Sequence, residues 1–259
     1  MELGLKDKVV IVTVGAKGIG EGIVQSLARE GAIPVIVGRS EEDNKKTAAR
    51  IEAEGGKCFQ VVAELTQADA CEKAVQRTID KFGRIDGLVN NAGVNDGVGL
   101  ERGNYQSFLD SLHRNLIHYY LVAHHALPAL KISKGSIVNI GSKTAETGQG
   151  NTSAYAASNG GRYALTREWG VELLPYGIRV NAVIVAECYT PLYEKWIQTL
   201  PNPETKLKEI TSKIPLGHRM TTAAEIADMV VFLLSERSSH TTGQLIHVDG
   251  GYVHLDRAL

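Results

Sequence analysis

Short apolar runs alternate with longer amphipathic stretches along the whole chain. The runs are rich in β-branched residues and predict strands at Val9–Val14, Ile33–Val37, Cys58–Ala63, Leu88–Asn90, Ser136–Ile140, Arg179–Ile184 and Gln244–Val248. The stretches between them predict helices near residues 18–30, 41–54, 67–82, 105–131, 153–174 and 222–235. Strands that are apolar on both faces are typical of a buried parallel sheet. The pattern therefore predicts an α/β fold, a doubly wound parallel sheet of seven strands with helices on both faces.

No repeat, low-complexity tract or flexible linker divides the 259 residues, so we expect one domain over 1–259. The alternation fails only at about 189–216, where Trp196 and three prolines interrupt it. Ligands of doubly wound sheets bind beyond the carboxyl ends of the strands. An insertion after a late strand is well placed to cover such a pocket, so we expect a substrate lid there, with an ordinary surface excursion as the alternative.

Charge and composition exclude several classes of partner. The formal net charge is −1 and acids and bases are mixed, which gives no reason to expect binding to nucleic acid or to an anionic membrane. No run approaches the ~20 apolar residues that span a bilayer, and the N-terminus lacks the pattern of a signal peptide. The three cysteines form no CxxC pair, and the helical histidines have no acidic partner at metal-ligand spacing. We expect a cytoplasmic protein with reduced thiols and no metal site.

A glycine-rich loop joins the first predicted strand to the first predicted helix. Glycines allow a tight turn and close approach of the backbone to a pyrophosphate, whose charge then lies at the positive end of the helix. This placement predicts a Rossmann-type dinucleotide site. The candidate cofactor residues of the loop are Gly15, Lys17, Gly18, Ile19 and Gly20.

The end of the second strand bears on the choice of cofactor. A carboxylate there would bind the ribose 2′-hydroxyl of NAD, whereas an arginine suits the 2′-phosphate of NADP. Gly38 and Arg39 occupy this region, and Lys17 is a second cation. We therefore expect NADP in preference to NAD, with a solvated basic pair as the alternative.

Several ordered motifs together resemble the short-chain dehydrogenase/reductase family over essentially the whole chain. Glu64-Leu65 after the third strand, the segment Asn90-Asn91-Ala92-Gly93 after the fourth and the closing Val248-Asp249-Gly250-Gly251 match its pattern. Further stretches, at 148–158, 164–173, 186–193 and 249–259, resemble sugar dehydrogenases of the L-fucose dehydrogenase type. The resemblance implies that Glu64, Leu65, Asn91, Ala92 and Gly93 contact the cofactor.

The resemblance also implies a catalytic set. Tyr155, thirteen residues beyond Ser142, would exchange a proton with the substrate oxygen while hydride moves to or from the nicotinamide. Ser142 would hold the same oxygen, and Asn115 would support a proton-relay water. The family's lysine, four residues after the tyrosine and on the same helix face, is here Asn159. Asparagine could bind the nicotinamide ribose but supplies no charge to favour the phenolate.

Two further departures concern the cofactor site. Val14 replaces the first glycine of the family's loop, and Val185 replaces a common proline beside the nicotinamide. We therefore expect an NAD(P)-dependent oxidoreductase with impaired turnover. One alternative is an engineered or natural inactive family member that serves as a nucleotide-binding or structural subunit. Another is a scaffold whose cofactor site Val14 blocks. Lys143 could replace part of the missing charge, but we expect its side chain to point to solvent.

Polar residues near Tyr155 favour a small polyol substrate, because sugar hydroxyls need paired donors and acceptors. The candidate substrate residues are Gln149, Asn151, Glu187 and Trp196, with loop chemistry as the alternative for the first two. We expect an L-fucose-like aldose or another secondary alcohol. The apolar helices at 105–131 and 153–174 imply, through the resemblance, a homotetramer.

Overall fold

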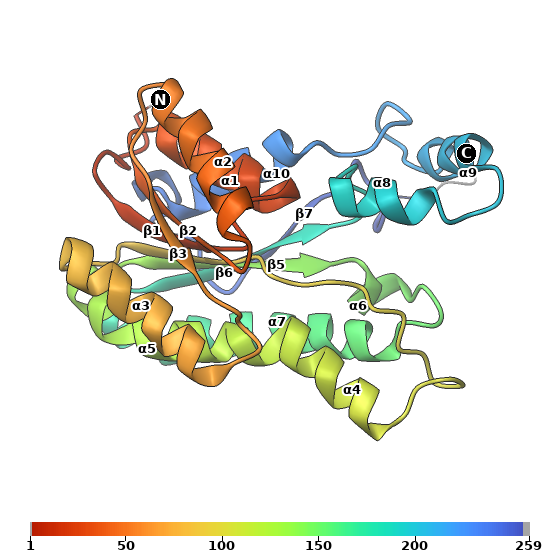
Figure 1. Ribbon diagram of the computed structural model, residues 1–259, viewed down its shortest axis with the longest axis horizontal. Helices are drawn as coiled ribbons and strands as arrows, with labels where there is room; N and C mark the ends of the chain where they lie inside the picture. The colour runs from red at the N-terminus through yellow and green to blue at the C-terminus, as the bar shows by residue number, and fades with distance from the viewer. Residues whose placement is uncertain (1, 256–259) are drawn as a thin grey trace.

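The computed structural model describes residues 2–255, and its centre is a parallel sheet (Figure 1). The predicted seven strands are confirmed with small shifts at their ends. They are β1 (Val9–Thr13), β2 (Ile33–Gly38), β3 (Phe59–Val62), β4 (Gly87–Asn90), β5 (Ser136–Ser142), β6 (Arg179–Val185) and β7 (Leu245–Val248). Their order in the sheet is β3-β2-β1-β4-β5-β6-β7, and every neighbouring pair is parallel. The chain thus winds outward from β1 in one direction and, from β4 on, in the other.

Helices cover both faces of the sheet (Figure 1). One face carries α1 (Gly18–Arg29), α2 (Glu41–Ala53) and α10 (Ala223–Leu234), and the other carries α3 (Ala68–Phe82), α5 (His118–Ser133) and α7 (Ser153–Glu172). The strand side chains alternate between the two layers: Val10 and Val12 belong to the first core, Val9 and Ile11 to the second. Because both faces are buried, the strands can be apolar without interruption, which is the pattern seen in the sequence.

The predicted helix at 105–131 is wrong in one respect, because it is not continuous. It consists of α4 (Tyr105–Leu112), a π-helical turn (His113–Ile117) and α5. A π-turn changes which carbonyls are bonded within the helix and is frequent at functional sites. Asn115 lies in this turn. Periodicity alone cannot reveal the turn, because one wide turn leaves the apolar spacing on either side unchanged.

The segment that breaks the alternation folds into two short helices, α8 (Pro191–Ile197) and α9 (Pro203–Ser212). The remaining short elements are α6 (Thr144–Thr147) and two 3-10 turns at Leu174–Tyr176 and Glu236–Ser238. Of the C-terminal stretch 249–259 that carries part of the resemblance, residues 256–259 lie outside the described residues. Within residues 2–255, none of the helices has the length and apolar character needed to cross a membrane.

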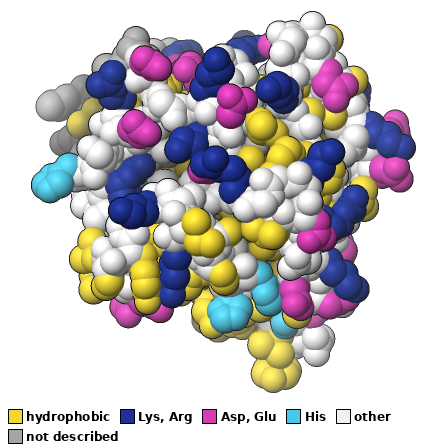
Figure 2. Space-filling view, turned by 90° about the vertical axis from the view of Figure 1, so that its left-hand side faces the viewer, with side chains coloured by type: hydrophobic (Ala, Val, Ile, Leu, Met, Phe, Trp, Pro, Cys, Tyr) yellow, Lys and Arg dark blue, Asp and Glu magenta, His cyan; other side chains and the backbone are white. Residues whose placement is uncertain are grey.

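Charged side chains of both signs are interspersed over the face in Figure 2, and hydrophobic side chains gather in its lower part beside histidines. This mixture agrees with the formal net charge of −1.

Candidate active site

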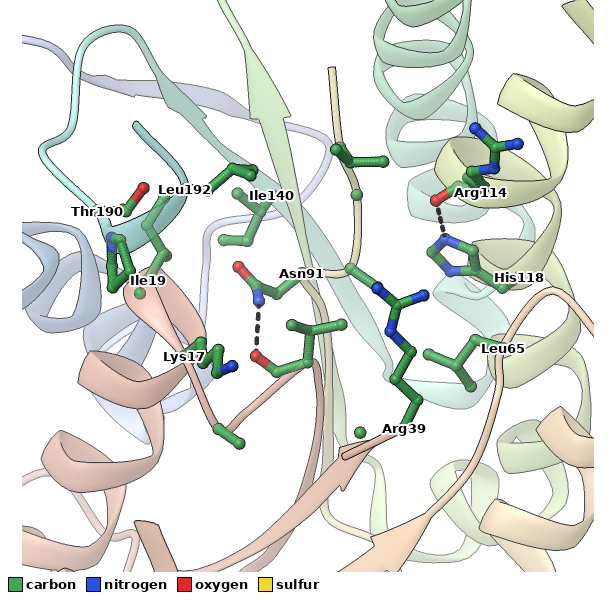
Figure 3. A pocket seen from close by; sticks show the side chains of 18 of the residues that line it. Lys17, Ile19, Arg39, Leu65, Asn91, Arg114, His118, Ile140, Thr190 and Leu192 are labelled. Carbon is green, nitrogen blue, oxygen red and sulfur yellow. Dashed lines mark hydrogen bonds between the residues drawn. The ribbon is translucent and has the colours of Figure 1, made fainter. Parts of the chain in front are cut away.

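A cavity of about 640 Å³ opens at the carboxyl ends of the strands, where β1 and β4 lie side by side and the winding direction reverses. Its walls come from the β1–α1 loop, the ends of β2 to β6, the π-turn, α7 and the start of α8. Figure 3 shows Arg39 and Leu65 on one side of it and Ile19, Thr190 and Leu192 on the other. This is the position at which doubly wound sheets bind ligands.

The glycine-rich loop has the geometry of a phosphate cradle. Gly18 opens α1 with a φ of +56°, and a Cβ on Gly20 would lie 2.0 Å from the Val14 carbonyl oxygen, so only glycine fits there. Among residues 2–255, no side chain caps the start of α1, which leaves its first N–H groups available to an anion. The loop thus fits the pyrophosphate of a dinucleotide.

The predicted cofactor residues assemble around this cavity. Its lining contains Lys17, Gly18, Ile19, Arg39, Glu64, Leu65, Asn91, Ala92 and Gly93. Gly15 shapes the loop from behind, since a Cβ there would lie 3.0 Å from the Val24 side chain.

Thr13 is a residue that the sequence analysis missed. Its hydroxyl oxygen accepts hydrogen bonds from the backbone N–H groups of Asn91 (2.8 Å) and Ala92 (3.0 Å). The Asn91 amide donates in turn to the carbonyl oxygens of Thr13 (3.0 Å) and Val14 (3.3 Å). These bonds tie the end of β4 to the start of the loop, so Asn91 positions the cradle.

Val14 adopts a φ of +51°, in the left-handed region that β-branched residues avoid. The strand therefore ends at Thr13, one residue earlier than predicted. The Val14 side chain is 40% exposed and lines the cavity, so burial compensates little of the backbone strain.

The two cations expected to select NADP both have carboxylate partners. Lys17 Nζ lies 2.6 Å from Asp43 Oδ2, and this hydrogen bond lowers the pKa of Asp43. Arg39 is 82% exposed and only 3.7 Å from Glu64 Oε2, a looser contact. Arg39 is thus the freer of the two to receive a phosphate.

Tyr155 and Ser142 line the same cavity as the loop. Tyr155 is half-buried near the start of α7, and Ser142 is the last residue of β5. The Ser142 hydroxyl oxygen accepts from the Thr144 backbone N–H at 3.3 Å and hydroxyl at 3.2 Å. The spacing of thirteen residues therefore brings an acid/base group and a hydrogen-bonding hydroxyl to one wall.

Asn115 and Asn159 are fully buried behind that wall. The Asn115 Oδ1 accepts from the Val94 backbone N–H at 2.7 Å, and the Asn159 Nδ2 donates to the Tyr155 carbonyl oxygen at 2.9 Å. The Asn159 Oδ1 accepts from Arg162 Nη1 at 3.0 Å. Arg162 lines the cavity and was missed; a cation seven residues after Tyr155, on the same helix face, is the signal that could have identified it.

The expectation that Lys143 points to solvent is wrong. Its side chain is buried and forms an ion pair with Glu187, and its ammonium lies 3.9 Å from the centre of the Tyr252 ring. Burial, and next the Glu187 carboxylate, raise the pKa of Tyr193. Lys143 is thus occupied by a carboxylate and does not replace the charge missing at Asn159.

The substrate candidates fall in different places. Gln149, Asn151 and Trp196 are exposed, Glu187 is half-buried, and all four lie outside the lining of the cavity formed by the described residues. Trp196 packs against Tyr193, which does line it, with ring centroids 5.0 Å apart. Thr190, at the start of α8, lies close to the glycine-rich loop: a Cβ on Gly18 would be 3.2 Å from its side chain.

One group of residues has the composition of a metal site. Glu146, His247 and His254 place their ligand atoms within 4.8 Å of one another. His247 Nε2 and Glu146 Oε1 are 2.9 Å apart, and the two imidazoles stack edge to face. The hydrogen bond and the ring contact account for this cluster without an ion.

A family model described as enoyl-(acyl carrier protein) reductase matches residues 14–253. The chain belongs to the short-chain dehydrogenase/reductase family. Among its relatives, the 3-oxoacyl-[acyl-carrier-protein] reductase FabG of Thermotoga maritima is 37% identical, over 96% of this chain and 99% of that protein. An L-fucose dehydrogenase of Bos taurus is 36% identical, over 94% of this chain and 88% of that protein.

Solved structures agree with this assignment. The crystal structure of the Cj0485 dehydrogenase is 47% identical, with a TM-score of 0.94 over 100% of this chain and 99% of that one. An actinorhodin polyketide ketoreductase with NADPH is 28% identical, with a TM-score of 0.91 over 96% and 98%. This short-chain dehydrogenase/reductase is therefore an oxidoreductase, and the family supports a nicotinamide cofactor for it.

Replacing Val14 by glycine should stabilise the protein, because glycine adopts positive φ without steric cost. We expect the Val14→Gly variant to gain about 1 kcal/mol in the free energy of unfolding, measured in urea, and to bind NADPH more tightly. Val62, also partly exposed but in β3, is the matched control. Val62→Gly should lose stability, and equal losses in both variants would contradict the strain at Val14.

Proposed function

We propose that this protein transfers hydride between a nicotinamide cofactor, preferentially NADP, and a secondary alcohol or carbonyl of a sugar, with an L-fucose-like aldose favoured. One observation carries the proposal: Tyr155 and Ser142 line the same cavity as the β1–α1 loop. The 36% identical L-fucose dehydrogenase supports a sugar substrate. FabG and the matched family model name acyl substrates, so a 3-oxoacyl thioester is the competing substrate for any assay.

The bound nicotinamide would supply or accept the hydride. The loop residues, with Gly18 at the helix start, would hold the pyrophosphate, and Arg39 would reach the 2′-phosphate. The Tyr155 hydroxyl would give a proton to a carbonyl oxygen, or take one from an alcohol, while the Ser142 hydroxyl donates a hydrogen bond to that oxygen. The segment 189–216 would cover the bound substrate as a lid.

The proposed substrate residues lie outside the lining of the cavity that the described residues form and would have to contact the substrate at its mouth. Glu187, whose charge is balanced by Lys143, can accept a hydrogen bond from a sugar hydroxyl. The side-chain amides of Gln149 and Asn151 can both donate and accept hydrogen bonds. Trp196 would form an apolar wall through its contact with Tyr193.

With Asn159 in place of a lysine, turnover would be lower than in relatives that have the lysine. The second candidate function, a nucleotide-binding subunit without turnover, is favoured by the strained Val14 together with Asn159. Binding of NADPH without oxidation or reduction of any sugar would support the second candidate.

Tyr155→Phe should lower the kcat of L-fucose oxidation at least 100-fold, because the group that exchanges the proton is lost. The dissociation constant of NADPH, from a fluorescence titration, should change by less than about threefold. Tyr176→Phe, which changes an exposed tyrosine of the 3-10 turn after α7, is the matched control and should keep its activity. Full activity of Tyr155→Phe would refute the proposed function.

Arg39→Gln should weaken NADPH binding by about tenfold and leave NADH binding nearly unchanged, because only NADPH has the 2′-phosphate. The measurement is the ratio of the two dissociation constants. Arg29→Gln, which removes another exposed arginine paired with a glutamate, is the control. An equal loss of affinity for NADPH and NADH would show that Arg39 attracts both nucleotides by its charge and does not recognise the 2′-phosphate.

A homotetramer is the proposed assembly. Exposed apolar side chains support it on α4, α5 and α7: Tyr105 (78%), Phe108 (37%), Tyr120 (51%), Ile132 (88%) and Val171 (68%). Light scattering after size exclusion should give four times the mass of the 28.0 kDa chain, and the mass of one chain would contradict this proposal. The free cysteines Cys58, Cys71 and Cys188 support the further proposal of a reducing, cytoplasmic location.

A further inference from the structure

A buried cation lies beside Tyr155 although the family's lysine is absent. Arg162 is three residues beyond Asn159 and about two helical turns beyond Tyr155 on α7. It is 3% exposed. Its guanidinium lies 4.4 Å from the centre of the Tyr119 ring and 6.0 Å from the centre of the Tyr155 ring.

All five N–H groups of Arg162 have acceptors, and all of these acceptors are neutral. Nε (2.7 Å) and Nη2 (2.5 Å) donate to the Asn115 carbonyl oxygen, and Nη2 also donates to that of Ala92 at 3.4 Å. Nη1 donates to the Ile140 carbonyl oxygen at 3.2 Å and to Asn159 Oδ1 at 3.0 Å. Asn115 belongs to the π-turn, whose altered bonding agrees with a carbonyl that accepts from outside the helix.

A buried guanidinium without a carboxylate partner is costly, and its positive charge acts on its surroundings. Burial raises the pKa of Tyr119, and the Arg162 charge opposes that rise. Burial lowers the pKa of His118 to about 4, so this neighbour is neutral at physiological pH. Among the charged side chains that line the cavity near Tyr155, Arg162 is thus the buried one.

We propose that Arg162 is the positioning residue that supplies, by its fixed charge, the stabilisation of the Tyr155 phenolate that a lysine at position 159 provides in the family. This role in catalysis rests on the function proposed above, in which Tyr155 exchanges the proton. Because every N–H is already bonded, Arg162 holds Asn115 and Asn159 in place and passes no proton. The guanidinium carbon lies 6.0 Å from the centre of the Tyr155 ring, and a fixed positive charge at this range favours the ionised form of a phenol.

Other groups near Tyr155 must be considered in any pH experiment. Those that face it or line the same wall are Tyr119 and His118 of α5, Arg114 of the π-turn, Tyr163 of α7, Glu146 of α6 and the Lys143–Glu187 pair after β5 and β6. Burial, and next Glu146, raise the pKa of Tyr163. The experiment therefore needs a signal that belongs to Tyr155 alone.

Carbon-13 at the tyrosine Cζ gives this signal by NMR, with the resonance assigned by its loss in Tyr155→Phe. In Arg162→Met the titration midpoint of Tyr155 should rise by about half to two pH units. The pH at which the rate of alcohol oxidation rises should increase by the same amount. Arg162→Lys, which keeps a cation, should restore at least half of the shift. Arg167→Met, an exposed arginine on the same helix, is the matched control and should leave the midpoint unchanged.

A midpoint that does not move in folded Arg162→Met overturns the proposal. If that variant does not fold, Arg162→Gln takes its place, because glutamine keeps a planar amide that can donate two hydrogen bonds and removes the charge. The double variant Asn159→Lys with Arg162→Met returns the cation to position 159 and should recover the wild-type midpoint. The NMR readout needs no turnover, so an inactive wild type would refute the proposed function and still leave the charge effect measured.

Discussion

The junction between the ends of β1 and β4 is the constraint on which the site depends. Both strands are buried on both faces, so a ligand can reach them only where the chain leaves the sheet. The Thr13 hydroxyl and the Asn91 amide fasten these two ends together with bonds of 2.8 to 3.0 Å. The glycine-rich loop starts from this junction, and the chain that follows β4 forms the opposite wall. A dinucleotide across this junction, as proposed, would be held mainly by backbone groups, and the surrounding side chains would adjust its affinity.

The same dependence explains which features were predictable from the sequence. Strands such as Val9–Thr13 are apolar throughout because the sheet is covered on both sides, so composition identifies them. Gly20 is predictable because a glycine-rich loop between a strand and a helix is typical of dinucleotide sites. The structure adds that a Cβ there would meet the Val14 carbonyl oxygen. Tyr155 and Ser142 are implied by the family resemblance, and the fold places both in the lining of one cavity.

Three features could not be read from the sequence, since each depends on contacts between distant segments. The π-turn at His113–Ile117 is a local change in backbone bonding, and the Asn115 carbonyl oxygen within it accepts from Arg162 of another helix. The burial of Lys143 requires Glu187, forty-four residues away, at the end of the neighbouring strand. Arg162 is one cation among many along the chain until the fold places the Asn115 carbonyl and the Tyr119 ring around it.

An arginine and a lysine at this site differ in what they can do. An ammonium has three rotatable donors and can release a proton, whereas a guanidinium stays protonated and presents its donors in a fixed fork. Here the fork is saturated by backbone carbonyls and Asn159, so the charge is permanent but immobile. Reduction of a carbonyl begins with a protonated tyrosine and needs only its single proton, whereas oxidation of an alcohol needs a phenolate. A fixed charge favours that phenolate but carries no proton away from the tyrosine after it has acted. If Arg162 supplies this charge, the chain keeps the electrostatic part of the family mechanism from a different position, while Asn159 supplies no ammonium. Another group must then exchange the proton of Tyr155 with solvent, whichever way the reaction runs.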